Sequence, residues 1–260
     1  MPELPEVEAY RALAETARGR EITAVAAPDP WYLKGGVDAR SLRNALVGRR
    51  LASSRRIGKL LLLDLEGGPT LGLRFGMTGR LVLDGVPGVE ALRYTSNAER
   101  PGWDRFALDL DRGGRLAVRD PRRLGGVILD PDESRLGPDA LAVRPAGLRA
   151  ALKGSAAPLK ARLMDQSRLA GVGNLIADEV LWRAGLDPAR PAQSLSDAEL
   201  HRLARVLRTV IEQLVARGGS HRGDLGPARV PGGRCPRDGA ALVRRTIGGR
   251  TTWSCPLHQR

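Results

Sequence analysis

The sequence predicts a multidomain α+β protein with an N-terminal helix plus β-sandwich, a helical domain, and a small C-terminal module. Three observations lead to this fold class. Short apolar segments separated by Gly, Pro and Asp turns fill the first half of the chain. After an Asp-Pro-Asp boundary at residues 130–132, apolar residues recur at helical spacing instead. The two cysteines, Cys235 and Cys255, both lie near the C-terminus.

The first domain, residues 1–132, begins with a predicted helix and continues in strands. Over residues 4–17 the apolar side chains fall on one side of a helix. Many short strands with turn punctuation favour a sandwich or a flattened barrel for the rest of the domain. The strands are expected at residues 22–26, 60–65, 70–75, 80–84, 106–110 and 116–118.

The second domain, residues 133–220, carries the helical pattern. The last of its helices is the clearest, because Ser196 caps it, Glu199 completes a capping box, and Gly218 follows its end. The helices are expected at residues 148–152, 159–164, 175–186 and 197–217.

The third part, residues 221–260, is expected to hold a linker and the C-terminal module. The stretch 218–233 is rich in Gly, Pro and Arg and is interpreted as a linker. The module after it is too small to be stable without a staple such as a metal. The N-terminus lacks a secretory signal, so a reducing cytosol is expected. There a metal site suits Cys235 and Cys255 better than a disulfide does.

The charge balance indicates a nucleic-acid-binding protein. The 42 Lys and Arg residues outnumber the 29 Asp and Glu residues, for a formal net charge of +13. Most of the basic residues are Arg, whose planar fork binds phosphate well. The longest apolar run is far too short to span a membrane, and an anionic membrane surface is the weaker alternative partner. Composition alone also permits a basic RNA-binding structural protein.

The N-terminal residues could carry chemistry. Removal of the initiator Met would expose the secondary amine of Pro2, and an α-amino group with a pKa of about 8 is partly neutral near neutral pH. Its attack on a sugar aldehyde carbon would give an iminium ion. Glu3 and Glu6 are three residues apart at a helix start, so one could protonate the sugar ring oxygen while the other moves protons. The alternative is a Pro-rich helix start whose acids merely suit the helix dipole.

Four motifs occur in order along the chain. They are Pro-Glu-Leu-Pro-Glu-Val-Glu at 2–8, Arg-Arg-Ile-Gly-Lys before four leucines at 55–63, Asp-Gln through Ala-Gly-Val-Gly-Asn to Asp-Glu at 165–179, and Gly-Arg-Thr-Thr before Cys-Pro at 249–256. With these motifs the sequence resembles the formamidopyrimidine-DNA glycosylase and endonuclease VIII family. The resemblance spans essentially the whole chain.

The resemblance implies a fold and an activity. The expected fold is a helix plus β-sandwich, a helix–two-turns–helix domain and a zinc-finger-like β-hairpin. The expected activity is that of a bifunctional DNA glycosylase and DNA-(apurinic or apyrimidinic site) lyase of base excision repair. Its partner would be double-stranded DNA containing damaged bases or abasic sites. A monomer with a cytoplasmic, nucleoid-associated, bacterial-type location and no membrane contact is expected.

The resemblance also assigns catalytic roles. Pro2 would form a Schiff base with C1′ and lead to β,δ-elimination, Glu3 would act as general acid and base, and Glu6 would support the site. Lys59 would reach a DNA phosphate near the lesion. Taken alone, Lys59 is better explained as a solvated basic residue at a strand start.

Further residues are assigned to DNA contact. Gly171, Gly173 and Asn174 would lie where the helix–two-turns–helix motif meets the DNA backbone, and Arg250 would bind a phosphate flanking the flipped nucleotide. A flipped nucleotide leaves a gap in the stack. By resemblance to the two loops that fill this gap, the wedge is assigned to three further side chains, Met77, Arg122 and Leu124. Met77 and Leu124 could instead be ordinary core residues.

The finger departs from the family pattern of four cysteines. Here the order is Cys235-x2-Asp238-x16-Cys255-x2-His258. His is a good zinc ligand and Asp a poorer one. The sequence therefore suggests one structural Zn²⁺ held by these four residues, with a metal-free finger held by packing as the rival.

The lesion preference also departs from the formamidopyrimidine branch. The stretch 220–227 is short and lacks that branch's Lys-Pro-Gly-Tyr-Phe-like string before the finger. We therefore expect oxidised pyrimidines, ring-opened purines or abasic sites as substrates rather than 8-oxoguanine. The alternative function is a non-catalytic member of the same fold that binds damaged or branched DNA.

Overall fold

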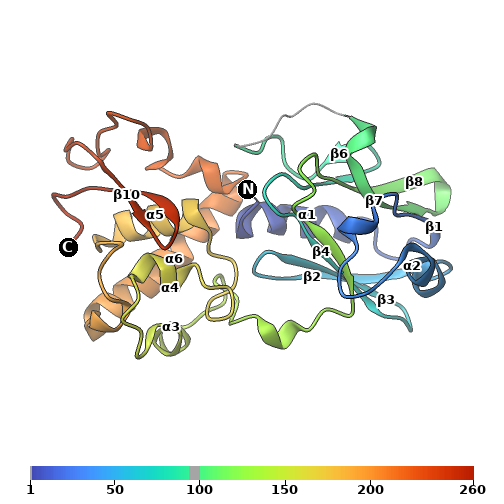
Figure 1. Ribbon diagram of the computed structural model, residues 1–260, viewed down its shortest axis with the longest axis horizontal. Coiled ribbons are helices and arrows are strands. Elements are labelled where there is room, and N and C mark those ends of the chain that lie inside the picture. Colours follow the sequence, from blue (N-terminus) through green and yellow to red (C-terminus); the bar gives the residue numbers. More distant parts are fainter. Residues whose placement is uncertain (1, 94–99) are drawn as a thin grey trace. The chain divides into compact units, whose positions relative to one another are not determined.

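The computed structural model of the protein describes residues 2–93 and 100–260. The chain forms two compact units, one reaching to residue 133 and the other running from residue 134 to the end (Figure 1). The helical segment and the C-terminal hairpin belong to the same unit. Within residues 2–93 and 100–260, no helix is long and apolar enough to cross a membrane.

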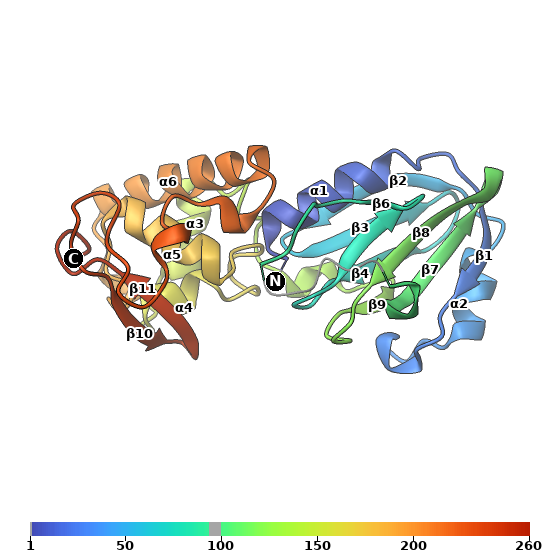
Figure 2. The same cartoon turned by 90° about the horizontal axis from the view of Figure 1, so that it is seen from above.

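The first unit is a helix plus β-sandwich, as expected. Helix α1 (Leu4–Glu15) packs along β2 and β3 of the smaller sheet (Figure 2). Every pairing in both sheets is antiparallel. One sheet has the order β1 (Ile22–Ala26), β7 (Asp104–Leu110), β8 (Gly114–Arg119), β5 (Arg80–Leu83), β6 (Val86–Pro87), and the other β2 (Leu51–Ile57), β3 (Leu60–Leu65), β4 (Thr70–Arg74), β9 (Gly126–Leu129).

Alternating apolar side chains of both sheets fill the core of this unit. Leu61 and Leu63 of β3 point into it, as do Phe106 and Leu108 of β7, and all four are at most 1% exposed. Tyr10 of α1 is fully buried in the same cluster. Helix α1 is therefore anchored in the apolar core of this unit.

Four α-helices and strands of this unit were not among the predicted segments, and the shortest of them, β6, has only two residues. Helix α2 (Ala39–Leu46) buries only Leu42 and Leu46, so its apolar pattern is too thin to stand out. Strand β2 has polar residues at its centre, and Leu51 is its one buried large apolar residue, so it lacks a clear apolar pattern. Strand β9 has four residues, begins at the second of two adjacent glycines, and is defined by its pairing with β4.

The second unit is helical with one hairpin. Helix α6 begins at the capping box of Ser196 and Glu199, and Gly218 beyond its end has φ 83°, so these predictions are confirmed. Helix α5 packs against α6. The elements are α3 (Pro145–Leu152), α4 (Leu159–Leu163), α5 (Asn174–Ala184), α6 (Asp197–Ala216), β10 (Val243–Ile247) and β11 (Arg250–Ser254).

The segment interpreted as a linker, residues 218–233, is packed onto α5. Its Leu225 is fully buried and Arg229 is 8% exposed. The buried Glu179 carboxylate of α5 accepts the backbone N–H groups of Asp224 and Leu225, at 3.1 and 2.9 Å. Because a buried acceptor satisfies its backbone, this Gly-rich stretch is held in place rather than solvated.

Candidate active site and metal cluster

The candidate catalytic residues gather at the start of α1. Pro2 is buried, and Glu3 and Glu6 are each 1% exposed. The backbone N–H of Glu3 donates to Glu6 Oε2 at 2.8 Å, as happens between the cap and the third helical residue of a capping box. The chain thus places two carboxyl groups beside Pro2 through local helix geometry alone.

Lys59 is brought toward the same end of α1 by strand β2. Ser54 Oγ donates to Glu15 Oε2 at 2.7 Å, and Arg56 Nε donates to Glu8 Oε2 at 3.0 Å. The strand therefore runs opposite to the helix, and the turn after it lies toward the helix start. That turn contains Gly58, with φ 57°, and Lys59.

Met77 lies in the loop between β4 and β5, which α1 braces. The Tyr10 hydroxyl donates to the Gly79 carbonyl at 3.1 Å, and its ring lies 4.5 Å from the Phe75 ring. Met77 itself is only partly buried. The helix that carries the acids therefore also supports this loop.

Arg122 and Leu124 lie in the loop between β8 and β9, next to the first loop. Arg122 Nη1 lies 3.8 Å from Met77 Sδ. A Cβ on Gly76 would meet the Leu124 carbonyl carbon at 2.4 Å, so the two backbones touch. Leu124 is 49% exposed, which shows that it is not a core residue. The structure brings these loops together within one unit.

In the second unit, the candidate phosphate-binding turn precedes α5. Gly173 is the residue before the helix, Asn174 is its first residue, and Gly171 has φ 113°. The Gln166 side chain shapes the turn, since its Nε2 donates to Val172 O at 2.9 Å and its Oε1 accepts from Gly171 N at 3.0 Å. The first N–H groups of a helix are donors suited to an anion.

Arg250 lies just after the hairpin turn. Ile247 pairs with Arg250 across Gly248 and Gly249, whose φ values are 57° and 71°, as a tight two-residue turn requires. Arg250 is exposed. The Lys160 ammonium donates to Thr251 O at 3.2 Å and so attaches this strand to α4.

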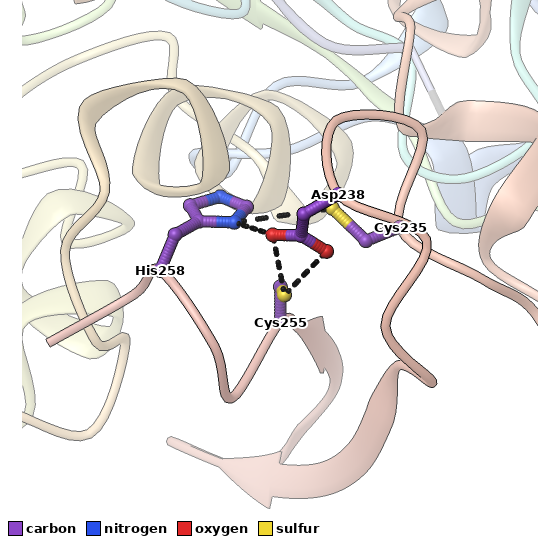
Figure 3. A group of neighbouring side chains, drawn as sticks. All are labelled: Cys235, Asp238, Cys255 and His258. Carbon is purple, nitrogen blue, oxygen red and sulfur yellow. Dashed lines mark hydrogen bonds and ion pairs between the residues drawn. The ribbon is translucent and has the colours of Figure 1, made fainter.

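The four predicted metal ligands come together (Figure 3). One donor atom from each of Cys235, Asp238, Cys255 and His258 lies within 4.8 Å of the others. His258 Nδ1 is 2.5 Å from Asp238 Oδ2, and Cys255 Sγ is 3.2 Å from the same oxygen. The hydrogen bond with His258 holds the pKa of the Asp238 carboxyl well below its usual range.

Trp182 of α5 orients two of these donors. Its indole N–H donates to Cys235 Sγ at 3.2 Å, and its carbonyl lies 3.2 Å from His258 Nε2. If a cation replaced the proton that His258 Nδ1 shares with Asp238, a proton on Nε2 could still donate to this carbonyl. Metal-binding histidines are oriented by such contacts. Two thiolates, an imidazole and a carboxylate therefore fit a tetrahedral divalent ion.

A buried ion-pair network, which the sequence patterns did not single out, holds the hairpin. Lys160 Nζ and Arg229 Nη2 contact the two oxygens of Asp178 at 2.7 and 2.8 Å. All three side chains are at most 5% exposed. The Trp253 N–H of β11 also donates to Asp178, at 3.3 Å. The sequence feature that could have indicated this network is a Lys and an Asp within apolar helical patterns.

Comparison with known proteins gives consistent matches along the chain. The family model for the formamidopyrimidine-DNA glycosylase N-terminal domain matches residues 1–127, and that for the H2TH domain of the same glycosylase matches residues 136–224. A formamidopyrimidine-DNA glycosylase of Thermus thermophilus is 40% identical, covering 100% of this chain and 98% of its own length. That of Paracoccus denitrificans is 36% identical, with 100% of each chain covered.

Solved structures share the fold. The complex between the Lactococcus lactis enzyme and DNA containing an abasic site has a TM-score of 0.84 and 25% sequence identity, with 100% of each chain covered. A complex of the same Lactococcus protein with Fapy-dG-containing DNA, formed by its G226P variant, also has a TM-score of 0.84 and 25% identity over 100% of each chain. The expected combination of sandwich, helix–two-turns–helix domain and hairpin is confirmed.

Proposed function

The chain belongs to the formamidopyrimidine-DNA glycosylase family, and from this premise we propose that it is a bifunctional DNA glycosylase and abasic-site lyase of base excision repair. The observation that carries the proposal is the gathering of Pro2, Glu3 and Glu6 at the buried start of α1. A merely solvated acidic helix start would not bury two carboxyl groups, because burial disfavours their charge. The DNA complexes of the Lactococcus lactis relative support damaged duplex DNA as the substrate.

In the proposed reaction the secondary amine of Pro2 attacks C1′ of the damaged nucleotide. The glycosidic bond breaks, and the base leaves with the bonding electrons and takes up a proton. Glu3 gives a proton to the ring oxygen, so the sugar opens and a Pro2 iminium ion forms. The iminium accepts electrons as a proton leaves C2′ and the 3′ phosphate departs. A second elimination releases the 5′ phosphate, and water then frees the amine.

DNA contacts are assigned to residues of both units. Lys59, Asn174 and Arg250 would bind phosphates, with the Gly173 backbone allowing close approach. Met77, Arg122 and Leu124 would fill the gap left by the extruded nucleotide. Their support is the exposure of Leu124 and the contact between Met77 and Arg122.

The metal proposed for the C-terminal cluster is one structural Zn²⁺. Cys235, Asp238, Cys255 and His258 would hold it, and Trp182 would orient Cys235 and His258. Bound zinc would cross-link the segment before β10 to the chain after β11. Metal analysis of protein purified without added zinc should give close to one equivalent, and a value well below that would contradict the proposal.

The lesions proposed are oxidised pyrimidines, ring-opened purines and abasic sites. The segment 220–227 is short and is held by Glu179 through two backbone hydrogen bonds. Arg183 and Arg217 also bind the Asp224 carboxylate, at 2.7 and 2.6 Å. A segment held in this way is poorly suited to close over 8-oxoguanine. Strong, selective cutting of 8-oxoguanine opposite cytosine would overturn this preference.

Borohydride trapping tests the chemistry. The substrate is a duplex oligonucleotide with one abasic site, and wild type is compared with Pro2→Gly and with Pro5→Gly as a matched control at the same helix start. We expect a covalent adduct that maps to Pro2, persists in Pro5→Gly and is strongly reduced in Pro2→Gly. Tight binding of the same duplex without an adduct would instead identify a non-catalytic DNA-binding protein.

A further inference from the structure

A carboxylate that was not among the predicted site residues joins the two wedge loops, residues 76–79 and 120–125, and belongs to the second of them. Asp120 directly follows β8 and is 0% exposed. Its Oδ1 accepts from Thr78 Oγ1 at 2.5 Å and from the backbone N–H of Arg122 at 3.3 Å. Its Oδ2 accepts from the backbone N–H of Gly125 at 2.8 Å.

Each of these three donors belongs to a proposed wedge residue or to the residue that follows one in the chain. Thr78 follows Met77 in the chain, the second donor is the backbone of Arg122 itself, and Gly125 follows Leu124. One buried carboxylate therefore fixes the backbone of Arg122 and Gly125 and holds the side chain of Thr78, the residue after Met77. The donors come from two loops. Thr78 of the first loop and Asp120 of the second are 42 positions apart in the sequence, so their hydrogen bond joins the loops.

The environment of Asp120 makes these bonds difficult to give up. A buried carboxylate that loses its donors costs free energy, because water cannot replace them. Tyr32 packs on the same group: its hydroxyl interacts with Asp120, and burial together with this negative charge raises the Tyr32 pKa far above its usual value. The loops are consequently held in one arrangement before DNA arrives.

We propose that Asp120 is a positioning residue that sets Met77, Arg122 and Leu124 into a single preformed wedge. The inference rests on the proposed glycosylase function and names a residue that acts on DNA only through its neighbours. A preformed wedge enters the stack without first losing loop entropy, so insertion and extrusion of the damaged nucleotide become more favourable. Loosened loops should hinder these steps while leaving the chemistry of Pro2 intact.

The test measures wedge insertion directly. A duplex carries a tetrahydrofuran abasic analogue, with 2-aminopurine opposite it as a fluorescent report of unstacking. Wild type should raise the fluorescence on binding. Asp120→Asn keeps the size of the side chain but replaces one acceptor oxygen with an amide donor. It should lose most of the fluorescence change and slow single-turnover base excision by about 10–100-fold.

Two further variants separate positioning from general damage. Asp104→Asn is the matched control, since Asp104 pairs with Arg119 at 2.7 Å on the same sheet and should leave the fluorescence unchanged. Thr78→Val removes a single donor and should show an intermediate loss, which keeps the test valid if Asp120→Asn fails to fold. Borohydride trapping on an already opened abasic sugar should survive in both wedge variants.

The outcomes distinguish this inference from the function on which it rests. Wild type that neither traps an abasic site nor raises the fluorescence would contradict the proposed glycosylase. Wild type that does both, with an unchanged fluorescence response and excision rate in folded Asp120→Asn or in Thr78→Val, would overturn the role of Asp120 alone.

Discussion

The two ends of the chain carry the two specialised sites, and they are supported in opposite ways. The proposed catalytic residues at the start of α1 are neighbours in sequence, and their helix packs into a core of 26 described buried residues through Val7, Tyr10 and Ala14. The proposed metal ligands come from two separate segments, and two of them, Cys235 and Cys255, share a cluster of four described buried residues with Trp182 and Leu225. A site attached to a large core needs little else, whereas the finger depends on polar contacts and on its ligand donors.

Metal removal should give the largest effect, and it should be confined to one end. Structural zinc contributes roughly 10–16 kcal/mol in isolated finger peptides, more than the small apolar cluster here is expected to replace. Chelation should therefore speed amide hydrogen exchange in residues 234–260 by orders of magnitude while β3 stays protected. Equal protection of the finger with and without metal would show that packing alone holds it.

Asp238→Cys sharpens the same experiment. It restores a sulfur ligand at this position and should retain zinc longer against a chelator than wild type does, because thiolate binds zinc better than carboxylate. Cys255→Ser should lose metal faster than wild type. If Asp238→Cys lost zinc to the chelator faster than wild type does, Asp238 would not be a ligand.

Glu3→Gln should give a large effect at the other end, on chemistry alone. Loss of the general acid should lower single-turnover base excision by about 10²–10⁴-fold, and the core should keep the melting temperature within a few degrees. Glu8→Gln is the matched control on the same helix, since its carboxylate contacts Arg11 and Arg56 rather than Pro2. A similar loss of activity in both variants would remove the special role of Glu3.

Asp178→Asn should destabilise the unit that carries the finger. Removing one partner from a buried ion-pair network costs about 3–5 kcal/mol, because Lys160 and Arg229 remain buried without their counter-charge. Urea unfolding measures the change. Asp197→Asn breaks the exposed pair with Arg149 and serves as the control, with little expected change.

Glu199→Gln should have the smallest effect and should show in the pH dependence. The hydrogen bonds from Arg190 hold the Glu199 pKa at about 2, below the ordinary 4.5. This carboxylate therefore adds stability above about pH 4.5 that disappears as the pH falls toward 2. The substitution should lower stability by about 1 kcal/mol near neutral pH and much less near pH 2. An equal loss at both pH values would exclude the ion pair as the cause.

Local signals were sufficient for much of this structure. The strand at 60–65 has the predicted bounds. Its four consecutive leucines indicated a short strand with both faces buried, and all four are buried in the structure. The capping box of α6 was predicted because it needs residues only three positions apart. The candidate metal ligands were chosen because Asp238 and His258 stand where the resembled family has cysteines, and the structure brings the four donor atoms together.

Residues whose partners are distant could not be predicted in this way. Asp120 follows a strand like many turn residues, and nothing local shows that its partner Thr78 lies in another loop. Asp178 resembles a polar interruption of a helix until the fold supplies Lys160 and Arg229. The segment 218–233 has the composition of a linker, and only Glu179 in another element keeps it packed.

Helix α5 also fixes the distance between the turn before it and the finger contacts of Trp182. Asn174 opens it and Trp182 lies eight residues later, about 12 Å along the axis at the usual rise of 1.5 Å per residue. Inserting one residue between them would turn Trp182 by about 100° and carry its indole and carbonyl away from Cys235 and His258. The length of this helix therefore sets how far the turn before it lies from the finger contacts of Trp182.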